Sequence, residues 1–274
     1  MQWLAILGFI VAIPAALAFY WYWSASRREA RRRRLREQPL PPGHIHILEN
    51  RVHLYRRLPG DLKSELRGHV NVLLAEKNFI GCNGLEIDDE IRVTIAGYAG
   101  LLLLQRQPTY FPGFTSILVY PDTFIAPDVS YDGDVEIEEA SERAGESWHR
   151  GPLILSWNDV LESTTDDDGF NVVLHEFAHK LDEEDSDTDG LPILHDDEHY
   201  EEWADILSRE FDAFEHSVHH DEEHVLDEYA LSSPAEFFAV ATESFFEEPA
   251  AMKAQLPDLY EQLRRYYRVN PAGW

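Results

Sequence analysis

The first 26 residues contain no Asp, Glu, Lys or Arg, and this uncharged stretch restricts the organisation of the chain more than any other feature. Residues 3–23 are nearly all apolar, and at about 1.5 Å per helical residue they are long enough to cross the hydrocarbon core of a bilayer. The stretch ends in the aromatic residues 19–23, which are typical of a membrane interface. Seven arginines follow between Arg27 and Arg36.

The arginines favour a membrane anchor over a secretory signal peptide. A signal peptide carries its positive charge before the apolar segment, whereas here the positive charge follows it and holds that flank in the cytoplasm. The alternative rests on Ala16-Leu17-Ala18, which resembles a signal-peptidase site. We therefore predict a protein of the bacterial inner membrane. Residues 3–23 would cross the membrane once, with the N-terminus outside and everything after Arg27 in the cytoplasm.

The rest of the chain has the composition of one folded domain. Residues 38–43 form a proline-rich linker that cannot continue the arginine helix, and no second linker appears. The predicted organisation is a transmembrane anchor at 1–26, an arginine-rich juxtamembrane segment and linker at 27–44, and a single domain at 45–274. The formal net charge of −28 argues against direct binding of nucleic acid, whose phosphates would be repelled. The single cysteine, Cys82, excludes a disulfide scaffold and a Cys-rich zinc module.

The hydrophobic pattern predicts an α+β domain that is mostly helical and contains a small mixed sheet. Apolar residues recur at helical spacing in six segments, which are 62–79, 88–104, 170–181, 198–214, 234–246 and 256–267. Two short apolar runs bounded by proline or glycine predict strands at 116–120 and 153–157.

The segment His175-Glu176-Phe177-Ala178-His179 has the spacing of a zinc-binding helix. Residues four apart lie on one face of a helix, so both imidazoles can reach one zinc ion at about 2.0–2.1 Å. Glu176 lies beside them, where it can take a proton from an activated water and deliver it to a leaving amine. The flanking residues are apolar and indicate a buried helix, in which two unligated histidines would be costly. The alternative is a pair of hydrogen-bonded core histidines.

A catalytic zinc needs a third protein ligand and an open position. Asp182 lies beyond easy reach of the same ion, so a role in orienting a ligand imidazole suits it better. Glu236 and Glu243 are seven residues apart and share one face of an otherwise apolar predicted helix. Ser233 and Glu236 also fit a helix-capping box. Spacing therefore leaves the choice of the third ligand open.

A second segment, His195-Asp196-Asp197-Glu198-His199, spells the inverted form of the motif. Its acidic residues suit the start of a helix, and no apolar surroundings would exclude water from a metal there. We assign it no role in the site.

Several segments resemble the Mlc titration factor A family of zinc peptidases over roughly residues 60–270. They are residues 175–182, Tyr229-Ala230 and 234–240, together with 145–148, Gly151-Pro152 and 155–157 upstream. The catalytic domain of anthrax lethal factor is a more distant likeness, which shares the Tyr and the Glu-Phe-Phe-Ala arrangement.

This resemblance implies a zincin-like, gluzincin-like metallopeptidase domain with one Zn²⁺ per chain. It implies three zinc ligands, which are His175, His179 and Glu236, with Glu176 as the general base. Tyr229 would stabilise the oxyanion of the tetrahedral intermediate. Glu243 and Asp182 would hold the ligands in place.

We therefore predict a membrane-anchored zinc metallopeptidase that acts on a peptide or protein substrate, with the strand at 153–157 pairing with an extended peptide. The alternative is a zinc-containing regulatory protein that sequesters a transcriptional regulator at the membrane with little or no turnover. Glu176 and Tyr229 favour the enzyme, because a purely structural zinc requires neither. The glucose-responsive repressor that binds family members is not carried over, because those members are soluble cytoplasmic proteins and an anchor is expected here.

Overall fold

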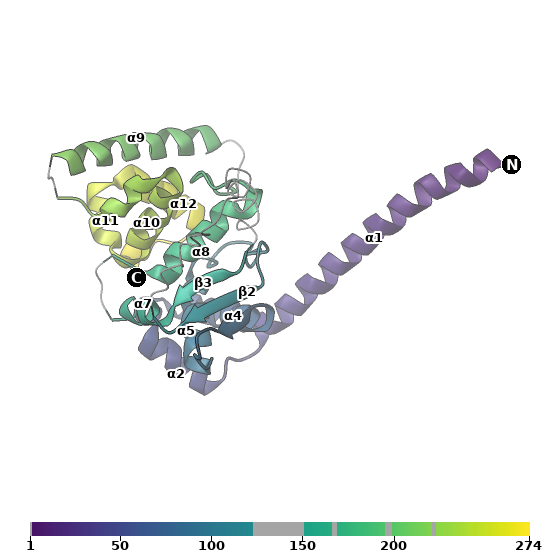
Figure 1. The fold of residues 1–274 in the computed structure, drawn as a ribbon, viewed down its shortest axis with the longest axis horizontal. Helices are drawn as coiled ribbons and strands as arrows, with labels where there is room; N and C mark the ends of the chain where they lie inside the picture. Colours follow the sequence, from purple (N-terminus) through teal and green to yellow (C-terminus); the bar gives the residue numbers. More distant parts are fainter. Residues whose placement is uncertain (1, 123–150, 166–168, 195–198, 221–222) are drawn as a thin grey trace, which may run out of the picture.

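The computed structural model describes residues 2–122, 151–165, 169–194, 199–220 and 223–274, and the side chains of residues 2–12, 14 and 15 lie outside the description. The described chain is mostly helical (Figure 1). The N-terminal helices are α1 (Gln2–Glu37), α2 (Pro42–Arg51), α3 (His53–Arg57), α4 (Gly60–Glu76) and α5 (Asp89–Leu101). The later helices are α7 (Trp157–Glu162), α8 (Val172–Asp182), α9 (Tyr200–His219), α10 (Pro234–Glu247), α11 (Pro249–Gln255) and α12 (Pro257–Tyr267).

Three short strands form a parallel sheet in the order β1-β2-β3, with β1 at Asn78–Gly81, β2 at Ser116–Tyr120 and β3 at Leu153–Ser156. Ile117 of β2 lies opposite Phe79 on one side and Leu153 on the other. The predicted mixed sheet is therefore wrong, because the described strands all run in the same direction. Parallel pairing depends on long crossover connections, and the alternation of apolar residues within one strand carries no signal for its direction.

Most of the predicted elements are confirmed with shifted ends. β2 occupies the predicted residues, and α10 extends the predicted helix by one residue, to Glu247. The helix predicted over 62–79 ends at Glu76, because the chain turns there into β1. Helices α2, α3, α7 and α11 and strand β1 were not predicted. Each of them is short, so it offers little periodicity to read.

Helix α8 crosses the middle of the domain (Figure 1). It packs against α5 and β3 on one side and against α10 on the other, and α9 lies along the outer edge next to α12. Its residues Val173, Leu174, Phe177 and Ala178 are at most 1% exposed and belong to the one continuous core cluster of the described residues. This burial is the environment that the apolar neighbours of the histidine motif indicated.

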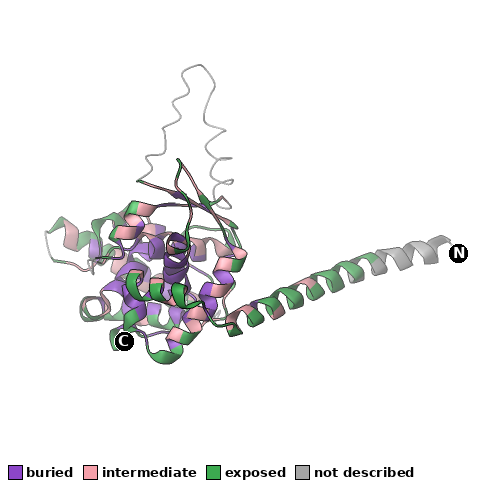
Figure 2. Cartoon of the chain, turned by 90° about the horizontal axis from the view of Figure 1, so that it is seen from below, coloured by how far each residue is buried: buried purple, intermediate pink, exposed green. Residues whose placement is uncertain are grey.

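Helix α1 projects from the domain and is exposed along most of its described length (Figure 2). Its C-terminal part packs against α4. There Arg32 is 7% exposed and forms an ion pair of 2.8 Å with Glu76, and Arg36 donates a hydrogen bond to the Tyr110 hydroxyl at 3.3 Å. The side chains of these two arginines therefore contact the folded domain of the same chain.

Among the residues that the structure describes, no helix combines the length and the apolar character needed to cross a membrane. In the described side chains of α1, the aromatic run ends at Trp23 and the arginines begin at Arg27. The transmembrane helix predicted over 3–23 is corrected by this finding. The correction includes the inner-membrane localisation and the membrane contact that depended on that helix.

Candidate metal centre

Two helices that pack against each other, α8 and α10, carry the candidate site. α8 begins where Asn171 Oδ1 accepts a hydrogen bond from the backbone N–H of Leu174 at 3.1 Å. α10 begins where Ser233 Oγ accepts one from the backbone N–H of Glu236 at 3.2 Å. Asn and Ser are favoured at these positions because they satisfy N–H groups that the first helical turn leaves free. The caps fix where each helix starts and therefore which way its side chains point.

The side chains of His175, His179 and Glu236 converge on one point, with their nearest nitrogen and oxygen atoms all within 4.8 Å of one another. Oε2 of Glu236 lies 2.9 Å from Nε2 of His175 and 3.3 Å from Nε2 of His179. The two Nε2 atoms are 3.1 Å apart. Of the three carboxylates that spacing left open, Glu236 is the one that meets both histidines. Two histidines and one carboxylate are a ligand set that zinc peptidases use.

The electrostatics of this cluster favour a cation. Burial lowers the pKa of His175, but the hydrogen bonds to Glu236 and Glu243 outweigh it and raise the pKa to about 10. Burial raises the pKa of Glu236, and the hydrogen bonds from His175 and His179 outweigh it and hold the pKa well below its usual range. The cluster thus binds a proton tightly between acceptor atoms. The donor set and its charge therefore fit a divalent metal.

Glu243 lies behind His175, two turns after Glu236 on α10. It is 2% exposed, and its Oε1 accepts a hydrogen bond from Nδ1 of His175 at 2.7 Å. Burial raises the pKa of this carboxyl. The hydrogen bond keeps a proton on Nδ1, so Nε2 is the ring nitrogen that faces His179 and Glu236.

Asp182 ends α8 and binds the loop that follows it. Its Oδ2 accepts a hydrogen bond from the backbone N–H of Gly190 at 2.9 Å, and burial raises its pKa to about 6. Among the described residues, Asp182 Oδ1 and His179 Nδ1 are both buried without a hydrogen-bond partner. Gly190 has a φ of +79°, and a Cβ there would lie 2.5 Å from the carbonyl oxygen of Pro234. Only glycine allows this close approach, which fixes the loop against the start of α10.

A cavity of about 820 Å³ opens beside the cluster, and Glu176 lines it together with His175, Glu243 and Phe170. Burial raises the pKa of the Glu176 carboxyl above its usual value. A carboxylate with a raised pKa is a stronger base toward water. Glu176 therefore presents a carboxyl group with a raised pKa at the wall of this cavity.

Tyr229 also lines the cavity, from a short 3₁₀ helix at Glu228–Ser232. Its side chain is 55% exposed, and its ring centroid is 6.0 Å from that of His175. Burial, followed by the nearby carboxylates of Glu236 and Glu176, raises its pKa. The phenol therefore stays protonated at neutral pH and can donate a hydrogen bond.

Comparison with known proteins places this chain in a family. The family of glucose-regulated metallo-peptidases M90 matches residues 26–268. The chain belongs to the M90 family. Its resemblance to the Mlc titration factor A family is thereby confirmed, and membership of a metallo-peptidase family implies a metal.

Two kinds of relative are similar in sequence to this chain over most of its length. An uncharacterised protein of Synechocystis sp. is 36% identical over 269 residues, which cover 97% of this chain and 96% of that protein. Mlc titration factor A of Yersinia pestis and that of Yersinia pseudotuberculosis are each 33% identical over 214 residues, 73% of this chain and 74% of theirs.

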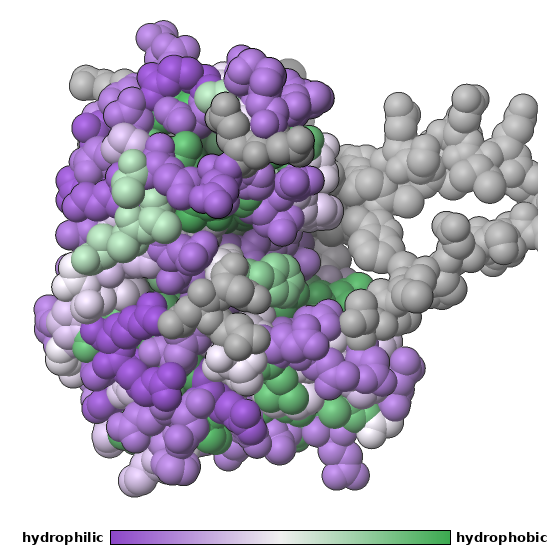
Figure 3. Space-filling model, turned by 90° about the vertical axis from the view of Figure 1, so that its left-hand side faces the viewer, coloured by the Kyte–Doolittle hydropathy of each residue, from purple (hydrophilic) through white to green (hydrophobic). Residues whose placement is uncertain are grey.

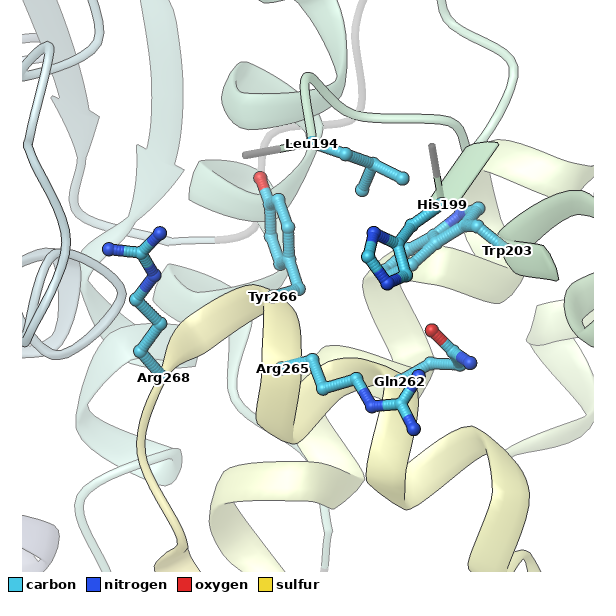
Figure 4. Close-up of a pocket in the computed structure, with 7 residues that line it drawn as sticks. All are labelled: Leu194, His199, Trp203, Gln262, Arg265, Tyr266 and Arg268. Atoms are coloured by element: carbon cyan, nitrogen blue, oxygen red, sulfur yellow. The ribbon is translucent and has the colours of Figure 1, made fainter. Parts of the chain in front are cut away.

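A second cavity, of about 270 Å³, lies between α9 and α12 (Figure 4). Its lining residues are Leu194, His199, Trp203, Gln262, Arg265, Tyr266 and Arg268. His199 is the last residue of the second histidine motif, whose positions 195–198 lie outside the described residues. No predicted site residue lines this cavity. The molecular face in Figure 3 is mostly hydrophilic, with hydrophobic residues in small separate patches.

Three residues around the metal centre were missed by the sequence analysis. The backbone N–H of Asn171 donates to Glu243 at 2.5 Å, and its side-chain amide donates to Glu247 at 2.7 Å. Glu247 is in turn 2.5 Å from the ring of His53. The position of Glu247, one turn after Glu243 in an apolar helix, was a signal that could have found it. Nothing near His53 in the sequence indicates its place.

Proposed function

We propose that this M90 chain is a zinc metallopeptidase that hydrolyses peptide bonds with Glu176 as general base. The observation that carries the proposal is the convergence of the His175, His179 and Glu236 side chains beside a cavity that Glu176 also lines. We further propose residues 45–274 as the catalytic domain, with 27–44 as the segment that connects it to the N-terminal part of α1.

Zinc is the proposed metal because two imidazoles and one carboxylate form its usual three-residue set in peptidases and leave a position open. A zinc ion held by His175, His179 and Glu236 would polarise the scissile carbonyl and make water more acidic. In the proposed roles, Glu243 orients His175 through the 2.7 Å hydrogen bond. Asp182 supports the end of α8 next to His179.

The remaining chemistry belongs to side chains of the cavity. Glu176 accepts a proton from the attacking water and returns it to the leaving amine, a transfer that its raised pKa supports. The Tyr229 hydroxyl donates a hydrogen bond to the carbonyl oxygen as that oxygen becomes negative. β3 is the last strand of the described sheet and contacts α8. An extended peptide would therefore add to its outer edge and reach the site.

A second candidate function is regulatory. Relatives of this chain carry the name Mlc titration factor A, which suggests that those proteins bind the regulator Mlc. We propose as the alternative that this chain binds a transcriptional regulator of that kind with little or no peptidase turnover. Glu176 and Tyr229 support the enzyme instead, because binding a regulator requires neither a base nor a hydrogen-bond donor at the cavity.

The test compares the full chain with its Glu176→Gln variant, both loaded with zinc and incubated with unstructured polypeptides and short aminoacyl substrates. Glutamine keeps the size of the side chain and removes the base, so both proteins should bind zinc and only the wild type should cleave. Mass spectrometry of the products would identify the cut sites. Cleavage by both proteins at the same rate, or by neither, would reject the peptidase. Zinc binding without cleavage would favour the regulatory function.

A further inference from the structure

A buried series of hydrogen bonds connects His175 to the N-terminal helices. Nδ1 of His175 bonds to Oε1 of Glu243 at 2.7 Å, and Oε2 of Glu243 accepts the backbone N–H of Asn171 at 2.5 Å. The Asn171 side-chain amide donates to Oε1 of Glu247 at 2.7 Å. Oε2 of Glu247 lies 2.5 Å from Nε2 of His53, within hydrogen-bond distance. The series therefore reaches from a proposed zinc ligand to α3.

This series lies inside the core. Asn171 is 0% exposed, Glu243 2%, Glu247 3% and His53 6%. A buried carboxylate without hydrogen bonds is costly, and here each carboxylate oxygen of Glu243 and Glu247 has a hydrogen-bond partner. Each residue in the series supplies a hydrogen-bond partner for the next one. Moving one side chain therefore breaks a hydrogen bond of its neighbour.

Asn171 is the point at which the series meets the metal-binding helix. Its Oδ1 caps α8, its backbone N–H holds Glu243, and its amide group holds Glu247. A displacement of Glu247 would therefore be felt both at the start of α8 and at the carboxylate that orients His175. At the far end, Nδ1 of His53 is 3.0 Å from the Tyr98 hydroxyl, which keeps the imidazole ring in place.

We propose that Glu247 and His53 are positioning residues for the metal ligand His175, acting through Asn171 and Glu243. Neither belongs to the three proposed metal ligands or to the residues that line the cavity. Instead they set the direction of the Nε2 lone pair of His175, and the contacts between α3 and α10 thereby become part of the metal site. This inference rests on the proposed function, because it requires a metal at the His175, His179 and Glu236 cluster.

The chain offers a matched control for His53. His69 is 2% exposed, its Nδ1 is 2.8 Å from the buried Tyr110 hydroxyl, and its Nε2 is 3.5 Å from Glu65. Like His53, it is a buried histidine with a tyrosine hydroxyl at Nδ1 and a glutamate near Nε2, although among the described residues its Nε2 forms no hydrogen bond. Glu65, however, bonds onward to Gln105 rather than to Asn171. The His69→Gln change should cost folding stability without reaching the metal.

The experiment uses the full chain with the variants His53→Gln, Glu247→Gln and His69→Gln. Zinc affinity is measured by competition with a chromophoric chelator, and the ligand geometry by the visible absorption of bound Co²⁺. Thermal unfolding of the metal-free proteins shows which variants are folded. We expect His53→Gln and Glu247→Gln to weaken zinc binding by about tenfold and to change the Co²⁺ spectrum. The His69→Gln variant should keep the wild-type affinity and spectrum.

Wild-type affinity and spectrum in the folded His53→Gln and Glu247→Gln proteins would overturn the positioning role. An equal loss of affinity in His69→Gln would also overturn it, because the effect would then be general destabilisation. Glu247→Gln keeps the shape of the side chain and decides the matter if His53→Gln does not fold. A wild-type chain that binds no zinc would reject the proposed function together with this inference, whereas zinc binding that the variants leave unchanged rejects the inference alone.

Discussion

The imidazole of His175 is held between two carboxylates, with Nδ1 2.7 Å from Oε1 of Glu243 and Nε2 2.9 Å from Oε2 of Glu236. The two carboxylates come from the same helix, seven residues apart, so one face of α10 both presents a candidate ligand and orients another. Glu243 is buried, whereas Glu236 is 20% exposed at its side chain. The buried carboxylate is thus available to fix the ring, and the more open one to bind a metal.

Replacing Glu243 with glutamine should weaken zinc binding by about 10–100-fold. An amide has one acceptor oxygen where the carboxylate has two, so either Nδ1 of His175 or the backbone N–H of Asn171 loses its acceptor. Competition with a chelator measures the change. Glu261→Gln is the control, because the described partners of Glu261 are Arg264 and Arg265 of its own helix. Unchanged affinity in Glu243→Gln would contradict the orienting role.

Zinc binding should release about one proton at neutral pH. The pKa of His175 in the metal-free chain is raised to about 10, so the ring carries a proton there that a metal must displace. Below that pKa, the apparent affinity for zinc should therefore increase by about tenfold for each unit by which the pH is raised. Calorimetric titration in two buffers of different ionisation enthalpy measures the proton count. Identical heats in both buffers would show that no proton leaves.

The same pKa predicts how the stability of the metal-free chain depends on pH. The pKa of His175 is raised above its ordinary value of 6.5, so the protonated form favours the folded state. This contribution is complete below pH 6.5 and is lost as the pH rises toward about 10. Denaturant unfolding across this window should show the free energy of unfolding falling in the wild type. In His175→Gln the slope should be smaller, and equal slopes would contradict the assignment.

Removing the hydroxyl of Tyr229 should slow peptide hydrolysis and leave the metal in place. The Tyr229→Phe variant loses the proposed donor to the developing oxyanion, and we expect kcat to fall by about 10²–10³-fold. Its zinc affinity should match that of the wild type, because Tyr229 is not a proposed ligand. The exposed Tyr20 on α1 supplies a control, Tyr20→Phe, with wild-type kinetics. A Tyr229→Phe enzyme with normal kcat would remove this residue from the mechanism.

The junction between α1 and α4 should depend on Arg32. The guanidinium of Arg32 contacts both carboxylate oxygens of Glu76 at 2.8–3.2 Å, and it is 7% exposed. Arg32→Ala leaves that carboxylate without its cation and should lower the free energy of unfolding by about 2 kcal/mol. The neighbouring Arg33 is exposed, so Arg33→Ala should change it by less than about 0.5 kcal/mol. Urea unfolding compares the two, and equal effects would contradict a specific role for the ion pair.

Local pattern was enough to predict the helix of the histidine motif, because the spacing of His175 and His179 and their apolar neighbours all act within a few turns. It was not enough to choose between Glu236 and Glu243, because that choice depends on how α10 packs against α8. Ser233 and Glu236 also fit a helix-capping box, and Ser233 does cap α10. The sequence pattern therefore could not separate a capping role for Glu236 from a metal-binding one. The family resemblance supplied the ligand set that spacing had left open.

The features that sequence reasoning missed depend on distant residues. His53 and Glu247 are 194 positions apart, so no local window contains both. The direction of the strands depends on connections that periodicity does not describe. The prediction for residues 3–23 failed for a related reason. It took the arginines after the apolar run as a membrane flank, whereas α1 continues as one helix whose C-terminal part packs against α4, with Arg32 paired to Glu76.

The two helices of the metal centre also set the time at which metal can be acquired. His179 and Glu236 are 57 residues apart in the chain. A polypeptide leaving the ribosome therefore exposes both histidines well before the carboxylate that completes the set, and a metal captured at that stage would be held only weakly. With the proposed ligands, tight metal binding therefore has to wait until α10 has been synthesised and has docked on α8.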